Sequence, residues 1–248
     1  MNKQFFVVLL VLLLQVSSCT SSKTIQYENI PLQRAQIELA EAQLLDIGIL
    51  IFDPNLPKEE QELIFPEVRK AEARYMPYHL KTTLEDTGFW GGIWVLPEKS
   101  EAMDLIVSGR VEISNGLKVA VRIGVWDITG REWINKVYET TVPQSAYSKR
   151  RDHTQDPYQN LYNKISNDLL EIKNLLSLAE LQRISEIGDL RFAAELIPDV
   201  YEDYLEKNSK DIISAIRLPS ENDAMMERIR SVKEREFILV DTLNEYYA

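Results

Sequence analysis

The sequence predicts an α/β (α+β) fold, in which a small mixed sheet is followed by a helical extension. The main observation is a set of three alternating apolar and polar runs between residues 104 and 142. Asn115-Gly116 separates the first two runs, and both residues tolerate the positive φ that a type I′ hairpin turn requires. A second turn, Asp127 to Gly130, separates the second and third runs. We therefore expect a three-stranded antiparallel meander.

The middle run of the meander has one clear core face, because its side chains alternate between apolar and mixed character. The expected core face carries Val119, Val121, Ile123 and Val125. The other face carries Lys118, Ala120, Arg122, Gly124 and Trp126.

The segments around the meander complete the order β-α-β-β-β-β-α. A short apolar, β-branched run at residues 44–52 predicts a first strand that is buried on both faces. Residues 66–86 predict a helix that is kinked or split beside Pro77, and residues 89–96 predict the next strand. After the meander, apolar residues recur every three or four positions from residue 157 to 187, which predicts one long helix with Gly188 as its stop.

Further helices are predicted at both ends of the chain. Residues 33–43 favour a short helix, residues 190–207 continue helically with a new start at Pro198, and residues 221–246 predict a last helix. Its expected inward residues are Ile229, Val232, Phe237, Val240 and Leu243. We expect this helical extension to cover the sheet or to offer a surface for self-association as a homo-oligomer.

The first eighteen residues have the features of a targeting segment. Lys3 is followed by an unbroken apolar run at residues 5–14, which is too short to span a bilayer. The run ends at Val16-Ser17-Ser18-Cys19, which resembles a bacterial lipobox. The resemblance implies that Cys19 is lipidated and becomes the first residue of the mature protein. Because Thr20 follows in place of Asp, it also implies sorting to the outer membrane. An ordinary secretory signal with an accidental cysteine is the alternative.

These features predict four regions. They are a lipoprotein signal peptide at residues 1–18, a lipid-anchored tether at 19–43, the α/β domain at 44–187 and the helical extension at 188–248. Cys19 is the single cysteine of the chain, so its lipidation leaves no thiol for a disulfide, a thiolate metal site or a nucleophile.

Composition and motifs exclude several functions. The net charge of −11 argues against nucleic-acid binding, and the one basic cluster, residues 149–151, is expected to be a solvated loop. The two histidines, His79 and His153, lack metal-ligand spacing, so we expect no metal and no cofactor, and we interpret His79 as a helix residue with a local partner. Carboxylate pairs such as Glu59-Glu60 and Glu202-Asp203 are interpreted as solvated faces, which leaves a glycan-acting acid pair as a minor alternative.

The four tryptophans of the chain, Trp90, Trp94, Trp126 and Trp133, cluster on the predicted strands. Core packing and cross-strand pairing are one interpretation of this cluster. The other is an exposed aromatic face that docks a protein partner, since tryptophan is a common anchor at interfaces. These four residues are therefore the candidate interaction residues.

Three stretches carry a resemblance to known domains: the apolar strand at residues 47–52, the start of the meander at residues 104–109, and the turn formed by Asp127, Thr129 and Gly130. With the element order, they resemble the amino-terminal domain of the Tol translocation protein TolB, and also curli-secretion-type lipoproteins and the lipoprotein activators of peptidoglycan synthases. Segments 191–196 and 234–237 resemble uncharacterised proteobacterial lipoproteins. The resemblance covers about residues 44 to 175 and brings no catalytic motif.

These observations lead to one expected function and its alternatives. We expect a lipoprotein that is anchored on the periplasmic side of the outer membrane, is not an enzyme, and acts as an interaction or assembly factor with an envelope protein partner. The alternatives are a subunit of a secretion or peptidoglycan-synthesis complex and a glycan-acting envelope enzyme. Because the meander has tight turns, no membrane pore is expected.

Overall fold

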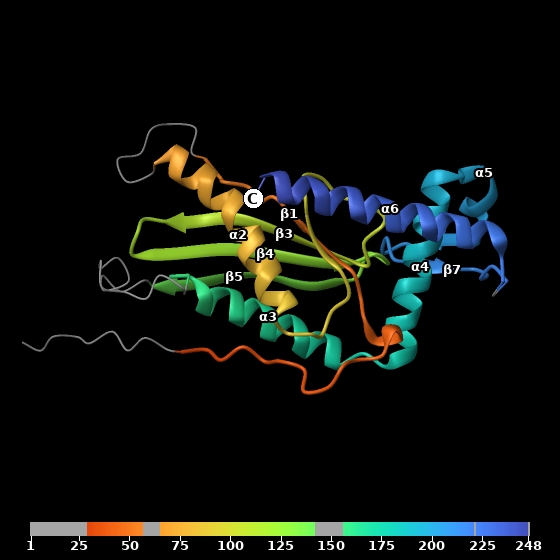
Figure 1. The fold of residues 1–248 in the computed structure, drawn as a ribbon, viewed down its shortest axis with the longest axis horizontal. Helices are drawn as coiled ribbons and strands as arrows, with labels where there is room; N and C mark the ends of the chain where they lie inside the picture. The colour runs from red at the N-terminus through yellow and green to blue at the C-terminus, as the bar shows by residue number, and fades with distance from the viewer. Residues whose placement is uncertain (1–28, 57–64, 142–155, 221, 248) are drawn as a thin grey trace, which may run out of the picture.

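The computed structural model describes residues 29–56, 65–141, 156–220 and 222–247, and within them it contains one large mixed sheet (Figure 1). The sheet has five strands in the order β2-β1-β3-β4-β5. These strands are β1 (Ile47–Leu50), β2 (Ile93–Leu96), β3 (Leu105–Ser114), β4 (Lys118–Asp127) and β5 (Glu132–Thr141). β1 is parallel to both β2 and β3, whereas β3, β4 and β5 form the expected antiparallel meander. The fold class and the order β-α-β-β-β-β-α are confirmed.

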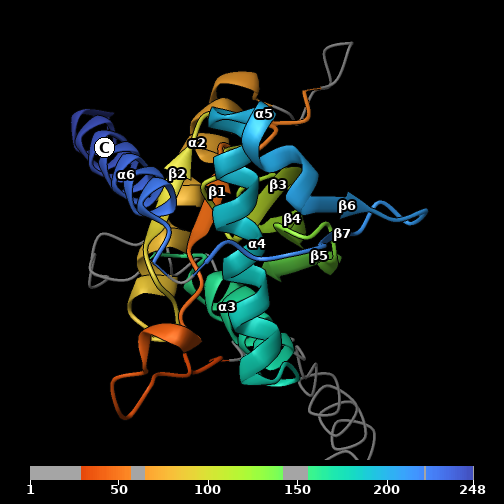
Figure 2. The same cartoon turned by 90° about the vertical axis from the view of Figure 1, so that its right-hand side faces the viewer.

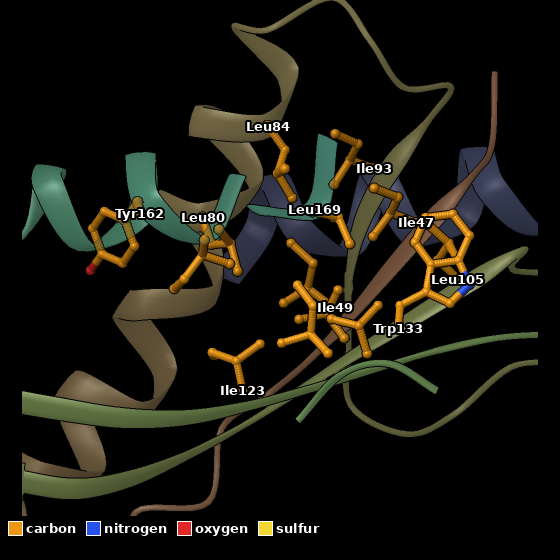
Figure 3. Packing of buried hydrophobic residues seen from close by; sticks show 14 of the residues in the cluster. Ile47, Ile49, Leu80, Leu84, Ile93, Leu105, Ile123, Trp133, Tyr162 and Leu169 are labelled. Carbon is orange, nitrogen blue, oxygen red and sulfur yellow. The ribbon is translucent and has the colours of Figure 1, made fainter. Parts of the chain in front are cut away.

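Two helices cover one face of the sheet, and they are α2 (Pro66–Glu85) and α3 (Gln159–Asn174). The core beneath them contains Val119, Val121, Ile123 and Val125 of β4, all fully buried, as their alternation predicts. Figure 3 shows Ile47 and Ile49 of β1 among the side chains of this core, together with Leu80 and Leu84 of α2 and Leu169 of α3. β1 is therefore an internal strand whose apolar run packs under two helices.

The helical extension covers part of the other face. Its main elements are α4 (Leu178–Leu196), α5 (Pro198–Tyr201) and α6 (Ala224–Tyr247). Leu190, Phe192, Met226 and Ile229 pack there with Trp94, Leu96, Met103 and Ile106 in a second core. Figure 2 shows α4 and α5 in front of the sheet, with α6 along the β2 side. The expectation that the extension covers the sheet is confirmed.

The long helix expected at residues 157–187 is two helices. α3 ends at Asn174 and α4 begins after Ser177, whose hydroxyl accepts a hydrogen bond from the backbone N–H of Glu180 at 3.3 Å. Glu180 in turn accepts from the backbone N–H of Ser177 at 2.8 Å, which completes a capping box. Gly188 is not a stop, because it lies inside α4, and the predicted boundary at 187/188 therefore falls within a helix.

Several shorter expectations also differ from the structure. Residues 33–43 form only a 3₁₀ turn, η1 (Glu41–Gln43). Before it, Gln33 bonds to Asn167 of α3, and the backbone N–H of Ala35 donates to the carbonyl of Thr87. α2 continues through Pro77 without the predicted split. The predicted strand at residues 89–96 begins only at Ile93, although Gly91 and Gly92 already bond with residues 45–47.

The region after α5 contains a small hairpin that was not expected. A 3₁₀ turn, η3 (Glu202–Tyr204), leads into β6 (Leu205–Lys207), which pairs with β7 (Ile213–Ala215). The backbone N–H of Ile213 donates to the carbonyl of Thr129 at 2.8 Å, which ties the hairpin to the β4–β5 turn. In α6, Ile229 is buried and Phe237 and Val240 pack on the second core, but the prediction that Val232 and Leu243 point inward is wrong.

Candidate functional site

Two carboxylates lie side by side where neighbouring parallel strands begin. Asp46 directly precedes β1 and Asp104 directly precedes β3, and the register pairs Ile47 with Leu105. The backbone N–H of Asp46 donates to Oδ2 of Asp104 at 2.9 Å. Oδ1 of Asp46 accepts from the backbone N–H of Gly92 at 2.8 Å. The two acids therefore join the starts of β1 and β3 to the turn that precedes β2.

Helices α4 and α6 bring further charges to the same place. Lys233 of α6 is buried, and its Nζ donates to Oδ1 of Asp189 in α4 at 3.3 Å. Arg230 donates through Nε to Oδ2 of Asp189 at 2.8 Å. Gly188 lies directly against Asp104, since a Cβ added at position 188 would stand 2.8 Å from Oδ1 of that carboxylate. We call Asp46, Asp104, Asp189, Arg230 and Lys233 the charged cluster.

Burial dominates the electrostatics of the charged cluster. Only 2% of the surface of Asp104 is exposed, and this desolvation raises its pKa to about 7. The charge of Lys233 acts in the opposite direction, whereas Asp46 and Asp189 add to the increase. Burial also raises the pKa of Asp46, although the hydrogen bond from Gly92 and the charge of Lys233 each lower it in part. Asp104 is therefore partly protonated near neutral pH.

The geometry of the charged cluster suits a structural clamp. A shallow hollow of about 340 Å³ lies beside it, lined by Asp189 and Arg230 but not by Asp46 or Asp104. Asp104 is buried between the sheet and the helices, whereas Asp46 is half-buried. In the described residues, the charged cluster included, no group of three or more His, Cys, Asp and Glu side chains is arranged to hold a metal ion.

The predicted acid pairs do not form this cluster. Glu202 and Asp203 are exposed, as expected, and Glu59-Glu60 lies outside the described residues. Sequence reasoning missed Asp46 and Asp104, although each stands immediately before a buried apolar strand. That position is the signal that could have found them.

His79 has the local partner that its position in a helix predicts. Its Nδ1 lies 3.7 Å from Oδ2 of Asp156, and its ring centroid lies 4.0 Å from that of Tyr75. Burial raises the pKa of Tyr75, and the neighbouring Asp156 carboxylate adds to this increase. The other histidine, His153, and the basic residues 149–151 lie outside the described residues.

The four tryptophans do not form one exposed face. Trp90, Trp94 and Trp133 are buried, so the interpretation of these three as exposed docking anchors is corrected to core packing. The Trp133 indole donates to Oδ2 of Asp127 at 2.9 Å, and Trp94 stacks on Phe237 with centroids 4.1 Å apart. Trp126 is half-buried and remains a candidate interaction residue.

Lys173 is a buried cation that sequence reasoning missed. It lies in the last turn of α3, with its Nζ 4.8 Å from the centroid of the Trp90 ring and donating to the carbonyl of Phe89. Burial lowers its pKa to about 8. This lysine fastens the turn before β2 to the end of α3.

The predicted lipidation residue, Cys19, lies outside the described residues, as does the rest of the leader. Among the helices that the structure describes, none combines the length and apolar character needed to cross a bilayer.

Comparison with known proteins gives distant structural similarities. No family model and no curated protein matches the chain. A hypothetical protein from Chlamydia trachomatis is similar with a TM-score of 0.32 and 8% identity, covering 52% of this chain and 96% of its own. A Helicobacter pylori homologue of the neuraminyllactose-binding hemagglutinin has a TM-score of 0.26 and 12% identity, covering 65% of this chain and 96% of its own. Neither similarity is close enough to support a function.

Proposed function

We propose that this chain is a lipid-anchored, non-catalytic interaction or assembly factor of the cell envelope, held on the periplasmic side of the outer membrane. The observation that carries the proposal is the leader, in which an apolar run ends at Val16-Ser17-Ser18-Cys19. Two or more acyl chains on Cys19 would give stable anchoring, because each buried CH₂ contributes about 0.8 kcal/mol.

The described domain is consistent with a role in binding. Asp46 and Asp104, the acids with raised pKa values, join the starts of β1 and β3 to each other and do not line the adjacent hollow. Half-buried Trp126 and the exposed apolar residues of α6, such as Leu239, are accessible to a partner. We therefore propose an envelope protein as the partner.

The anchoring is tested with Cys19→Ser, which changes only the sulfur atom. We expect the wild-type protein to fractionate with outer membranes and to carry acyl chains by mass spectrometry, and the variant to be released in soluble form. Native protein with an unmodified thiol or an intact leader would refute the proposal. Crosslinking in whole envelopes, with the same variant as control, tests for the protein partner.

A further inference from the structure

The first described residues are bound to α3 in an extended conformation. Two backbone N–H groups and two carbonyls of residues 30–33 are paired with side chains of α3. The pairs are Ile30 N to Asn160 Oδ1 (3.1 Å), Asn163 Nδ2 to Ile30 O (2.7 Å), Gln33 N to Asn167 Oδ1 (3.1 Å) and Asn167 Nδ2 to Pro31 O (2.9 Å). The tether is thus part of the domain from Ile30 onward.

The spacing of these side chains explains the contact. Asn160, Asn163 and Asn167 are three and four residues apart, so they lie on one face of the helix. An asparagine amide both donates and accepts, so one side chain can pair with both the N–H and the C=O of an extended backbone. We call these three residues the asparagine ladder.

The asparagine ladder shortens the distance that the chain can span between the anchor and the first bound residue. Between Cys19 and Ile30 lie residues 20–29, and ten residues reach at most about 35 Å when extended and about 18 Å as a flexible chain. A tether that stayed free to residue 43 would reach about 80 Å when extended. The ladder therefore determines which part of the domain lies near the anchor.

The tether leaves the domain at one end of its long axis. Figure 1 shows the described chain beginning beside the first turns of α3, at the end of the long axis that also holds the β3–β4 turn and the first turn of α2, whereas α5 and β7 lie at the opposite end. We call the first of these the turn end. It exposes large apolar side chains, with Leu117 60% and Phe65 68% exposed, and Leu56 is also exposed.

We propose that the turn end faces the lipid surface and that the asparagine ladder holds it there. This inference rests on the proposed lipid anchor. The short segment between Cys19 and Ile30 brings this end to the membrane first, where exposed apolar side chains gain contact with the interface between headgroups and acyl chains. The opposite end, with α4, α5 and the β6–β7 hairpin, then points away from the lipid and is open to the envelope partner.

Energy transfer from the protein to the membrane tests this orientation. The lipidated protein has no other thiol once Cys19 is acylated, so a donor dye can be placed by Ser114→Cys at the turn end or by Ser209→Cys in the turn between β6 and β7. Each protein is reconstituted in vesicles of phosphatidylethanolamine and phosphatidylglycerol that contain a trace of acceptor-labelled lipid. We expect greater transfer from position 114 than from position 209.

The ladder is tested by Asn163→Ala/Asn167→Ala in both labelled proteins. We expect this change to reduce the difference between the two positions, and Asn174→Ala, an exposed asparagine at the end of the same helix, to preserve it. Because Asn163 is buried, Asn167→Ala alone serves as the milder variant, with a smaller reduction in the same direction. Hydrogen exchange gives a second measurement, since the amide of Gln33, whose acceptor is Asn167 Oδ1, should lose protection in both ladder variants.

Four outcomes oppose the proposal. Equal transfer from both positions in the wild type overturns the orientation, and an unchanged difference in the ladder variants overturns the role of the asparagines. Light scattering that shows a dimer joined through the turn end assigns this surface to a second copy and overturns its contact with lipid. A protein without acyl chains that fails to bind vesicles overturns the proposed function as well, whereas an acylated protein with equal transfer overturns only this inference.

Discussion

The backbone N–H of Asp46 donates to the Asp104 carboxylate over 2.9 Å, so the residue before one parallel strand is fixed to the residue before its neighbour. Asp104 is sealed under α4, and burial raises its pKa from 3.8 to about 7. The folded protein therefore keeps a proton on Asp104 over a pH range in which the unfolded chain has lost it. Accordingly, the free energy of unfolding falls as the pH rises from about 4 to about 7.

Asp104→Asn should remove most of this pH dependence. Asparagine keeps an oxygen that can accept from Asp46 and resembles the protonated acid. Near pH 8 we expect the variant to exceed the wild type in stability by up to about 4 kcal/mol, since one pKa unit corresponds to about 1.4 kcal/mol. Near pH 4 the two should be similar. Urea unfolding at both pH values, followed by tryptophan fluorescence on the Cys19→Ser protein, measures the difference.

The control for this prediction is Asp199→Asn, which changes an exposed aspartate in α5. Its stability should follow that of the wild type at every pH. If the free energy of unfolding of Asp104→Asn fell with pH as steeply as that of the wild type, the raised pKa of Asp104 would be wrong. Burial raises the pKa of Asp46 in the same direction, so a small slope should remain in the variant.

The fold could be predicted where local signals were sufficient. The Asn115-Gly116 turn and the alternation of Val119 to Val125 place the meander, because turn chemistry and side-chain period are both readable from short stretches. The break between α3 and α4 was missed although Ser177 and Glu180 carry the capping-box signature. Apolar residues keep their spacing of three or four positions across the break, and this spacing predicted one continuous helix in spite of the capping-box signature.

Other features depend on partners that are distant in sequence. Gly188 was predicted to end a helix, but it lies within α4. The reason for a glycine at this position is that the Asp104 carboxylate occupies the space that a side chain would need. Residues 30–33 are extended because asparagines some 130 positions later bind their backbone. The candidate site has the same origin, since the pairing of Asp46 with Asp104 requires the strand order. Local patterns can mark Asp46 and Asp104 as residues that precede buried strands, but they do not show that the two residues lie together.

Arg69 should be among the most sensitive positions outside the charged cluster. Its buried guanidinium donates to the carbonyls of Asn55 at 2.9 Å and Glu112 at 3.0 Å, which ties the loop after β1 to β3. Arg69→Ala leaves these carbonyls unpaired, and hydrogen bonds to charged groups contribute about 1.5–3 kcal/mol. We expect a loss of about 2–3 kcal/mol, measured as a lower denaturant midpoint with an unchanged slope.

Two variants make the Arg69 prediction specific. Arg69→Lys keeps the charge but has no planar fork to reach both carbonyls, so it should also destabilise, by less than alanine. Arg74→Ala changes an exposed arginine on the same helix and should have little effect. Equal losses for Arg69→Ala and Arg74→Ala would contradict the assigned contacts.

Ser177→Ala tests whether the cap separates α3 from α4. Removal of an N-cap hydroxyl costs about 0.5–2 kcal/mol, and we expect a loss in that range by thermal or urea unfolding. Hydrogen bonds from Ser177 lower the pKa of Glu180, so the stabilisation from this pair is present at neutral pH and is lost as the pH falls. The difference in free energy of unfolding between the variant and the wild type should therefore become smaller at acid pH. Ser185→Ala, inside α4, is the control and should change stability little.

Phe237→Ala should release the second half of α6 while the sheet stays folded. The Phe237 ring stacks on Trp94 with centroids 4.1 Å apart, and this stack joins α6 to β2. Its loss should leave Lys233 and Arg235 accessible to trypsin, because the helix can then open locally without global unfolding. Leu239→Ala, an exposed position two residues later, should leave the cleavage rate unchanged. Cleavage of Phe237→Ala at the wild-type rate would mean that the salt bridges of Asp189 with Arg230 and Lys233 hold α6 without the aromatic stack.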